Sequence, residues 1–302
     1  MRRITFLILL LFCNSLVGQL ELPKYDANDT IVNHRGYTLS YNSKYKQANW
    51  VAYLLTGPST PLRTNPSTPL RTNPSTPLRT NPSTSLRTNP STPLRRTTSD
   101  TFRTGPSTVL RTGPSTPLRR TASASFSMHF ERTNDFMPDP LIPGTDFSID
   151  YKKSGYDRGH LAPAADMGYS METMVESFFY SNMSPQLPRF NRGVWKKLEM
   201  QVRRWASSYD SLYVVTGPVF DSSMTSIGPH RIAVPKAYYK VLLQKRNGSW
   251  EGIGFIIPNS TAKVDFKNYA TTIDKVEEIT GIDFFHTLAD EIEDQVEKVI
   301  GF

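Results

Sequence analysis

The sequence predicts an α+β domain in which helices flank an antiparallel sheet. Several short runs are rich in β-branched and aromatic residues, and two of these runs are joined around Asn247-Gly248, a typical hairpin signal. Residues 189–208 carry apolar side chains at helical spacing. Strands and helices do not alternate as they do in βαβ folds, so antiparallel pairing is favoured. With 302 residues, 38% of them hydrophobic, the chain can form a sizeable core.

The expected strands fall into two groups. The first group, Tyr37–Tyr41 and Asn49–Leu55, precedes a long segment of low complexity. In the second group, Ser211–Phe220 is expected to be a buried strand that ends in a Gly-Pro turn. Ile232–Gln244 is expected to pair with Trp250–Ile257 in the hairpin.

The longest predicted helix covers Arg189–Ser208. Its core stripe recurs at three- and four-residue spacing and comprises Trp195, Leu198, Val202 and Trp205. A short helix is expected over Thr272–Thr280, ending at Gly281, and a helical tail over Thr287–Val299. The acidic residues of that tail are expected to form a solvated face without a function: Glu291, Glu293, Asp294 and Glu297.

Residues 1–18 have the pattern of a secretory signal peptide. Arg2 and Arg3 form a basic start, a short apolar run follows, and Gly18 is a small residue at a suitable cleavage point. Because the apolar run is too short to span a bilayer stably, we expect an exported protein, periplasmic or secreted. No stable membrane insertion is expected after cleavage.

Two other interpretations of this N-terminus are a buried strand or helix and a lipoprotein anchored through Cys13. The bulky Phe12 disfavours the second, since a small residue is wanted at that position. Cys13 is the only cysteine, which excludes a disulfide scaffold and a cysteine-based zinc cluster.

Residues 56–125 form an insertion built largely from an eight-residue repeat. Eight units run from Thr56 to Arg119, and TNPSTPLR occurs without change at 64–71 and 72–79. Two prolines and one leucine per intact unit cannot bury enough apolar surface to offset the entropy of ordering the chain, so a disordered, extended loop is expected. The insertion is either a duplication tolerated without a role or a basic tether that holds polyanions near an active site.

The predicted organisation therefore has four parts. A signal peptide (1–18) precedes the N-terminal strands of the domain (19–55). The disordered insertion (56–125) follows, and residues 126–302 form the main part of the domain with its helical tail. Lengthening a loop about tenfold costs only about 2 kcal/mol, so the domain can accept the insertion.

The net charge of +8 does not describe the folded part of the chain. Residues 56–120 contain ten arginines and one acid, and Arg2 and Arg3 add two more bases. The rest of the chain holds 23 of the 35 basic residues and 26 of the 27 acidic residues. Binding of nucleic acid must therefore rest on a local basic site.

His160 is the histidine with the most distinctive setting among the five in the chain. An acid and a base, Asp157 and Arg158, precede it, and Gly159 is expected to let the backbone turn tightly. No two histidines have the spacing of a helical metal pair. A capped turn with a surface ion pair is the alternative to a catalytic cluster.

The predicted helix Arg189–Ser208 carries a second polar group. At 100° per residue, Asn191, Glu199 and Arg203 fall within about 120° of one face of this helix. An amide oxygen, a carboxylate and a guanidinium in line suit a hard cation and phosphate oxygens. The alternative is an ordinary ion pair between Glu199 and Arg203, four residues apart.

Three motifs in this order resemble a known family. DRGH at 157–160, NMSPQ at 182–186 and FNRGVWKKLE at 190–199 are similar to the motifs of the DNA/RNA non-specific endonucleases of the ββα-metal (His-Me finger) superfamily. The resemblance covers roughly residues 37–55 and 130–285. It implies a ββα-metal fold and metal-dependent hydrolysis of phosphodiester bonds in DNA and RNA with little sequence preference.

The resemblance implies the following roles around the reacting phosphate. His160 is the general base that activates water, and Asn191 is the single direct protein ligand of one Mg²⁺, with Mn²⁺ compatible with the same ligands. Glu199 holds the waters of the metal and belongs to the catalytic residues. Asn182 and Asp157 fix the geometry around the site and are grouped with the substrate-binding residues.

Three arginines complete the implied site. Arg158 and Arg203 bind phosphate. Arg132 is the matching position for the arginine that stabilises the transition state, and it lies just after the insertion. The expected partners are DNA and RNA substrates, and no oligomeric state is assigned.

Two other functions remain open on the sequence alone. One is a catalytically weak nucleic-acid-binding or surface protein that keeps the fold despite the insertion. The other is a phosphodiesterase or phosphatase for small phosphates. Cleavage of polymeric substrates distinguishes the endonuclease from both.

Overall fold

The computed structural model describes residues 20–57, 130–209 and 211–302. The predicted signal peptide and nearly all of the predicted insertion lie outside these residues. All of these residues belong to one compact unit. None of the described helices is long and apolar enough to cross a membrane.

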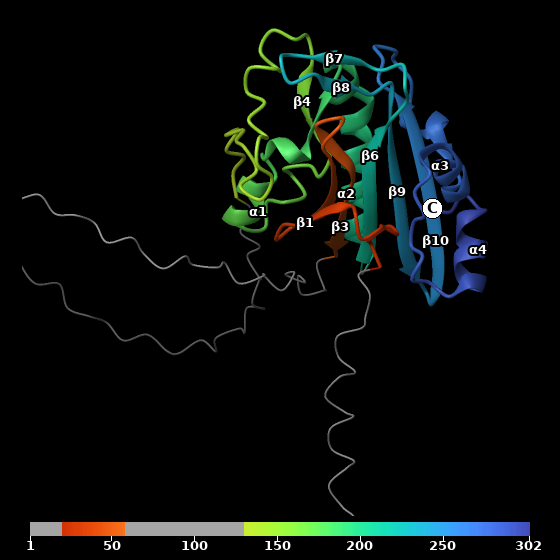
Figure 1. The fold of residues 1–302 in the computed structure, drawn as a ribbon. Coiled ribbons are helices and arrows are strands. Elements are labelled where there is room, and N and C mark those ends of the chain that lie inside the picture. The colour runs from red at the N-terminus through yellow and green to blue at the C-terminus, as the bar shows by residue number, and fades with distance from the viewer. Residues whose placement is uncertain (1–19, 58–129, 210) are drawn as a thin grey trace, which may run out of the picture. The chain divides into compact units, whose positions relative to one another are not determined.

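A seven-stranded antiparallel sheet forms the centre of this unit (Figure 1). Its strand order is β1-β2-β3-β6-β9-β10-β11, and two small two-stranded sheets, β4-β5 and β7-β8, accompany it. The strands are β1 (Thr30–Asn33), β2 (Thr38–Asn42), β3 (Gln47–Thr56), β4 (Asp157–His160), β5 (Met183–Gln186), β6 (Ser211–Val219), β7 (Thr225–Ile227), β8 (Ile232–Val234), β9 (Ala237–Arg246), β10 (Ser249–Pro258) and β11 (Ala270–Thr271). The helices are α1 (Met171–Glu176), α2 (Lys196–Ser208), α3 (Ile273–Thr280) and α4 (Asp290–Glu297), with short 3-10 turns at Tyr180–Asn182 and Phe266–Tyr269.

Both faces of the central sheet are covered. Along β3 the side chains alternate, so Val51 and Tyr53 pack in the cluster that contains the buried side of α2. Trp50 and Ala52 point to the other face, where α3 and α4 pack. Figure 1 accordingly shows α3 and α4 beside β10, with β4 on the other side of the sheet.

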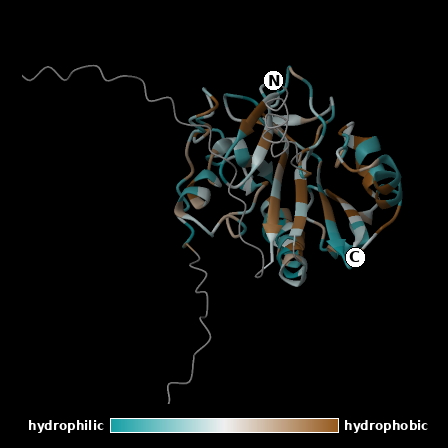
Figure 2. Cartoon of the chain, turned by 90° about the horizontal axis from the view of Figure 1, so that it is seen from below, coloured by the Kyte–Doolittle hydropathy of each residue, from teal (hydrophilic) through white to brown (hydrophobic). Residues whose placement is uncertain are grey.

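Strand β9 is buried along most of its length because it runs between these two layers. Figure 2 shows the hydrophobic residues gathered along the central strands and hydrophilic residues on the helices. One charged residue interrupts this pattern, since Lys240 is fully buried on the face that α2 covers, between Tyr238 and Leu242.

The structure contains the two strands and the helix that the family resemblance implies. Strands β4 and β5 pair in antiparallel fashion, with His160 opposite Met183. After β5 the chain enters a wide helical turn, Phe190–Trp195, and continues into α2. Two strands followed by a helix form the predicted ββα arrangement.

The long strands lie where the sequence predicts them, with one correction. The predicted strand Ile232–Gln244 is two strands, β8 and β9, which belong to different sheets. Pro235 lies between them and has no N–H to donate to a ladder, so the pairing changes there. Sequence periodicity does not predict the short strands β1, β4, β5, β7 and β11 or helix α1.

The predicted helix Arg189–Ser208 also needs a correction. Its first six residues form a π-helical turn, in which the Lys196 N–H bonds to the Asn191 carbonyl five residues earlier. Gly193, with φ −106° and ψ −107°, breaks the regular winding. The prediction that Asn191 shares one straight face with Glu199 and Arg203 is therefore wrong, because 100° per residue applies only from Lys196 onward.

The C-terminal tail is helical as predicted, but its acidic face is not entirely solvated. Glu297, the last residue of α4, is 7% exposed. Its neighbour Val296 packs against the sheet beside Gly252 of β10, whose missing side chain allows this close approach. The helix therefore turns one carboxylate inward.

Helix α2 depends on its buried stripe for its position. Leu198→Ala should lower the free energy of unfolding by about 2–5 kcal/mol, because Leu198 is fully buried and the deletion leaves a cavity under α2. Urea denaturation followed by circular dichroism measures this loss. The matched control is Met200→Ala on the exposed side of the same helix, which should change stability by less than about 0.5 kcal/mol. Equal losses in both variants would contradict the packing described.

Candidate active site

A cleft of about 560 Å³ opens beside β4 and the start of α2. Seven of the eight site residues predicted from the sequence line it: Arg132, Asp157, Arg158, His160, Asn191, Glu199 and Arg203. Its basic side chains are Arg132, Arg158, Arg192, Lys196 and Arg203, and its acidic ones are Asp157 and Glu199. The cleft is thus locally basic although the chain outside the insertion is slightly acidic, and it favours an anionic ligand.

Gly159 lies in strand β4 rather than in a tight turn, which corrects the sequence-based expectation. The structure gives a different reason for a glycine here. A Cβ atom at this position would lie 2.2 Å from Cδ of Gln186, a fully buried side chain on β5. The glycine therefore lets β5 approach closely beside His160.

His160 occupies a largely buried, aromatic environment at the end of β4. It is 8% exposed, and its ring packs edge-on against Phe178 with 4.9 Å between ring centroids. Its Nε2 atom has no hydrogen-bond partner among the described residues. Burial, with a smaller contribution from the nearby Arg132 cation, lowers the pKa of the imidazole to about 3. The ring is therefore neutral at neutral pH.

Asn182 is the one predicted residue outside the cleft lining. Its amide is fully buried, accepts from the Ala162 N–H at 2.9 Å and donates to the Ala162 carbonyl at 2.9 Å and to the Ser177 carbonyl at 2.8 Å. These bonds fix the chain directly after His160, as expected for a residue that sets geometry. Its side chain is fully buried and does not line the cleft, so these bonds favour the geometry-setting role over direct contact with substrate.

Asp157 links the beginning of β4 to the helical turn after β5. Its Oδ2 accepts from Nδ2 of Asn191 at 2.9 Å and from Nε of Arg192 at 2.8 Å, and its Oδ1 accepts from Nη2 of Arg192 at 2.6 Å. Because the Asn191 amide nitrogen is engaged, its carbonyl oxygen is the atom left for an incoming ligand. Asp157 thus orients Asn191.

Arg203 is paired, but not with Glu199. Its Nη1 donates to Asp166 at 2.7 Å, and the hydroxyl of Tyr53 donates to the other oxygen of Asp166 at 3.0 Å. Arg203 therefore forms its ion pair with Asp166, and the alternative of an ordinary Glu199–Arg203 surface pair is not observed. Arg203 lines the cleft, and its ion pair with the buried Asp166 fixes the position of its guanidinium.

A buried ammonium lies under this group. Nζ of Lys240 lies 5.0 Å from the ring centroid of Trp195 and has no hydrogen-bond partner among the residues that the structure describes. Burial lowers the pKa of Lys240, while the carboxylates of Glu199 and Asp166 oppose that shift. Burial raises the pKa of Glu199, against the opposing pull of Lys240. The two charges stabilise each other inside the protein.

Arg158 is held by aromatic side chains. Its guanidinium lies 4.9 Å from the ring centroid of Phe136, 5.6 Å from that of Tyr151 and 5.9 Å from that of Tyr180. These cation–π contacts contribute part of the stabilisation of the Arg158 guanidinium. Nε of Arg158 is buried without a partner among the described residues.

Arg132 is exposed at the edge of the cleft. Its Nε donates to Asn134 at 2.8 Å, and its guanidinium lies 5.3 Å from the Phe178 ring, the ring that also packs against His160. Arg132, the predicted site residue nearest to the insertion in sequence, therefore lies beside the imidazole of His160.

Comparison with known proteins decides the family. The family model for the DNA/RNA non-specific endonucleases matches residues 119–291. The chain belongs to this family.

Several relatives of this endonuclease family are similar in sequence. Nuclease 1, mitochondrial, of Schizosaccharomyces pombe is 36% identical over 173 residues, which is 50% of this chain and 53% of the relative. A nuclease of a Nostoc strain is 32% identical over 190 residues, covering 59% of this chain and 69% of the relative. Human endonuclease G, mitochondrial, is 34% identical over 150 residues, 45% of this chain and 50% of the relative. The chain spans about half the length of most of these curated relatives.

The fold is likewise shared with a solved structure. A chain in the crystal structure of the EndoG/EndoGI complex superposes with a TM-score of 0.62 at 23% identity and covers 90% of each chain. This similarity confirms the α+β, ββα-metal fold of the non-specific endonucleases that the motifs predict.

Two charged residues beneath the cleft, Lys240 and Asp166, are not predicted from the sequence. Lys240 stands inside the apolar run Ala237–Leu243, where its charge at a core position was a signal that could have been used. Asp166 carries no comparable local signal, because its partner Arg203 is 37 residues away. Only the folded chain brings Asp166 under α2.

Gly159→Ala tests the close packing of β4 against β5. The added methyl group must displace the buried Gln186 side chain and shift the strand that carries His160. We expect a loss of about 1–3 kcal/mol in the free energy of unfolding, measured by urea denaturation. Gly248→Ala in the hairpin between β9 and β10 is a contrasting control, since nothing lies within 4 Å there and only its φ of +87° is strained. An undisturbed Gly159→Ala protein would contradict the packing described.

The low pKa of His160 has a consequence for stability. An unfolded histidine titrates near 6.5, whereas the folded imidazole titrates near about 3. Between these values the unfolded chain binds a proton that the folded protein does not, so stability falls as pH falls through this window. Between pH 7 and pH 5 the protein should lose about 2 kcal/mol more than His160→Asn. Urea denaturation at both pH values measures the difference, and a His160 NMR resonance that titrates between pH 6 and 7 would contradict it.

Proposed function

We propose that the protein is an exported, metal-dependent endonuclease that hydrolyses phosphodiester bonds of DNA and RNA with little sequence preference. One observation carries the proposal. The cleft of this member of the non-specific endonuclease family brings the neutral imidazole of His160 together with an oriented asparagine and five basic side chains. This set combines a proton acceptor, an oxygen ligand and phosphate-binding groups.

The cleft suits the backbone of a nucleic acid better than its bases. Arg158 and Arg203 are held from below by aromatic rings and by Asp166, so their guanidinium groups are preorganised for phosphate oxygens. Contacts to phosphate position a substrate without reporting its sequence. Cleavage with little sequence preference follows.

The residues present fit a hard divalent cation such as Mg²⁺ or Mn²⁺. The Asn191 amide nitrogen bonds to Asp157, so its oxygen is the ligand atom, and Glu199 is a carboxylate in the same cleft whose pKa is raised by burial. Asn191 would hold the ion directly and Glu199 would hold its waters. When bound, such an ion offsets charge that develops on the phosphate and on the leaving oxygen.

His160 accepts a proton from the attacking water in this mechanism. The imidazole is neutral and lines the cleft, and no described residue hydrogen-bonds its buried Nε2. A pKa of about 3 is low for a general base, but a phosphate anion bound beside the ring favours the protonated form and raises the pKa toward the working pH. Substrate binding thus raises the pKa of His160 and makes it a better proton acceptor.

Arg132 acts on the same phosphate from the edge of the cleft. Its cation lies over the Phe178 ring and close enough to lower the pKa of His160. As negative charge builds up on the phosphate in the transition state, this guanidinium stabilises it.

Export is proposed on the sequence of residues 1–18 alone. A basic start, a short apolar run and a small residue at the cleavage point support delivery to the periplasm or the exterior. The nucleic acid cleaved would then lie outside the cytoplasm.

Purified protein should cut plasmid DNA and RNA with Mg²⁺ and stop cutting when a chelator is added. His160→Ala should lower the cleavage rate by about 10²–10⁴-fold, the usual effect of removing a general base, while retention of DNA on the protein persists. The exposed His286, outside the cleft, provides the control, and His286→Ala should cut at the wild-type rate. Gel analysis of timed digests measures all three rates.

The result that would overturn this assignment is cutting by His160→Ala at the rate of His286→Ala. Turnover of small phosphate esters without cutting of either polymer would instead favour a phosphodiesterase for small substrates. Retention without any cutting by wild type would favour a binding protein.

A further inference from the structure

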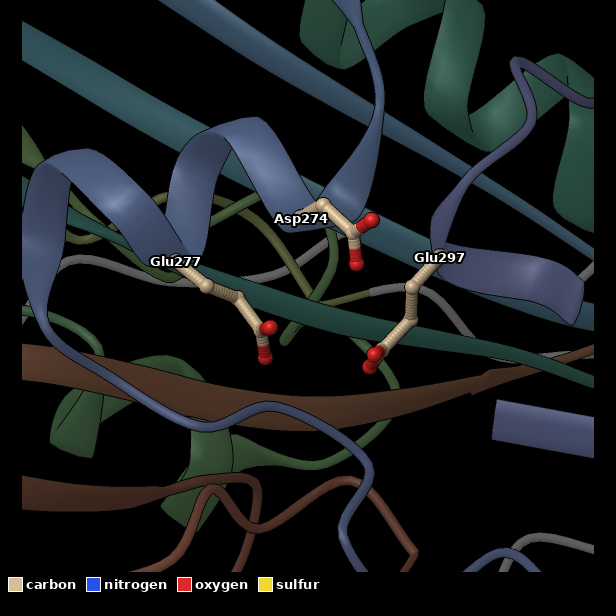
Figure 3. A group of neighbouring side chains, drawn as sticks. All are labelled: Asp274, Glu277 and Glu297. Atoms are coloured by element: carbon tan, nitrogen blue, oxygen red, sulfur yellow. The ribbon is translucent and has the colours of Figure 1, made fainter. Parts of the chain in front are cut away.

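A second group of carboxylates lies on the sheet face opposite α2, away from the cleft. It comprises Asp274 and Glu277 of α3 and Glu297 at the end of α4 (Figure 3). One carboxylate oxygen from each residue lies within 4.8 Å of the other two. Figure 3 shows the three side chains pointing toward a common space between the helices. Residues three apart share one side of a helix, so α3 contributes two carboxylates toward α4.

Glu297 is the most unusual member of this acidic cluster. It is 7% exposed, and its Oε1 has no hydrogen-bond partner among the described residues. A buried carboxylate without a partner is costly, since its charge has left water without compensation. This buried, unpartnered oxygen would gain a partner if a cation bound between the three carboxylates.

The surrounding charges make the imbalance larger. Asp283 and Glu293 also act on Glu297, and the nearby cation Lys24 pairs with Asp283 at 3.2 Å. Burial, followed by the neighbouring carboxylates, raises the pKa of Glu297 to about 8 and that of Glu277 to about 7. These raised pKa values reflect burial and the mutual repulsion of the carboxylates, which a bound cation would offset.

We propose that Asp274, Glu277 and Glu297 bind a calcium ion. Ca²⁺ takes oxygen ligands at about 2.3–2.6 Å, so two oxygens on the same ion lie at most about 5 Å apart, which the cluster satisfies. Three protein carboxylates suit Ca²⁺ better than Mg²⁺, which keeps most of its waters and is usually held by one or two carboxylates. The absence of imidazole and thiolate from these three ligands argues against zinc and copper.

The site is structural rather than catalytic. An ion between Asp274 and Glu297 connects α3 with α4, and both helices pack on the sheet face opposite the cleft. The side chain of Val296, next to Glu297, packs at Gly252 of β10. Binding of Ca²⁺ would therefore fasten the C-terminal helix to the sheet. This proposal does not depend on the endonuclease activity.

The experiment uses chelator-treated full-length protein and titrates CaCl₂ by calorimetry and by thermal unfolding. All variants are made in an Asn191→Ala background, because this change removes the direct metal ligand of the cleft. Binding of one Ca²⁺ per chain is expected. At a Ca²⁺ concentration about a hundred times Kd, the Tm should rise by about 5–10 °C.

Glu297→Gln is the decisive variant, because it keeps the shape of the side chain and removes its charge. It should bind Ca²⁺ at least tenfold more weakly. In chelator it should unfold at or above the Tm of its parent, since it removes a buried carboxyl that repels its neighbours when it ionises, and this shows that the variant folds. Glu291→Gln, an exposed position of α4 outside the cluster, is the matched control and should keep the parental Ca²⁺ response.

Two results would overturn the proposal. One is the absence of a Ca²⁺-dependent heat and Tm shift, which would indicate that the carboxylates share protons instead. The other is an equal shift in Glu297→Gln and Glu291→Gln, which would place binding elsewhere. A larger Tm rise with Mg²⁺ than with Ca²⁺ would overturn the identity of the ion.

Discussion

The ammonium of Lys240 inside the central sheet is the interaction on which both the packing and the cleft depend. An isolated charge at such a position is unfavourable, so it needs carboxylates close by. Glu199 and Asp166 supply them, and Asp166 in turn holds Arg203 at 2.7 Å. The position of α2 on the sheet and the charges that face a substrate are thus parts of one arrangement. A change that moves α2 also disturbs the electrostatics of the cleft.

Much of the fold follows from periodicity, because the long strands and α2 bury large apolar stripes. Strands β3, β6 and β10 are found within a few residues of their predicted limits. Periodicity fails where the backbone departs from regular hydrogen bonding. Pro235 divides one apolar run between two sheets, and Gly193 interrupts a helix whose side-chain pattern looks regular.

The predicted site was found through short motifs rather than through composition. Asp157, His160 and Asn191 lie together because β4 and β5 pair and the chain then turns into a helix. Residues that act across the core have no local pattern of this kind. The partners Asp166 and Arg203 are joined only by folding, and the inward turn of Glu297 depends on how α4 meets β10.

The π-helical turn before α2 has a consequence for how Asn191 is aimed. Such a turn holds one residue more than a regular α-helical turn needs. Removing a single residue from Phe190–Trp195 would allow ordinary winding and rotate everything upstream by about 100°. The Asn191 amide would then lose its hydrogen bond to Asp157, while the hydrophobic contacts of α2 stayed intact. Helical pitch, rather than the identity of a side chain, thus determines where the Asn191 amide points.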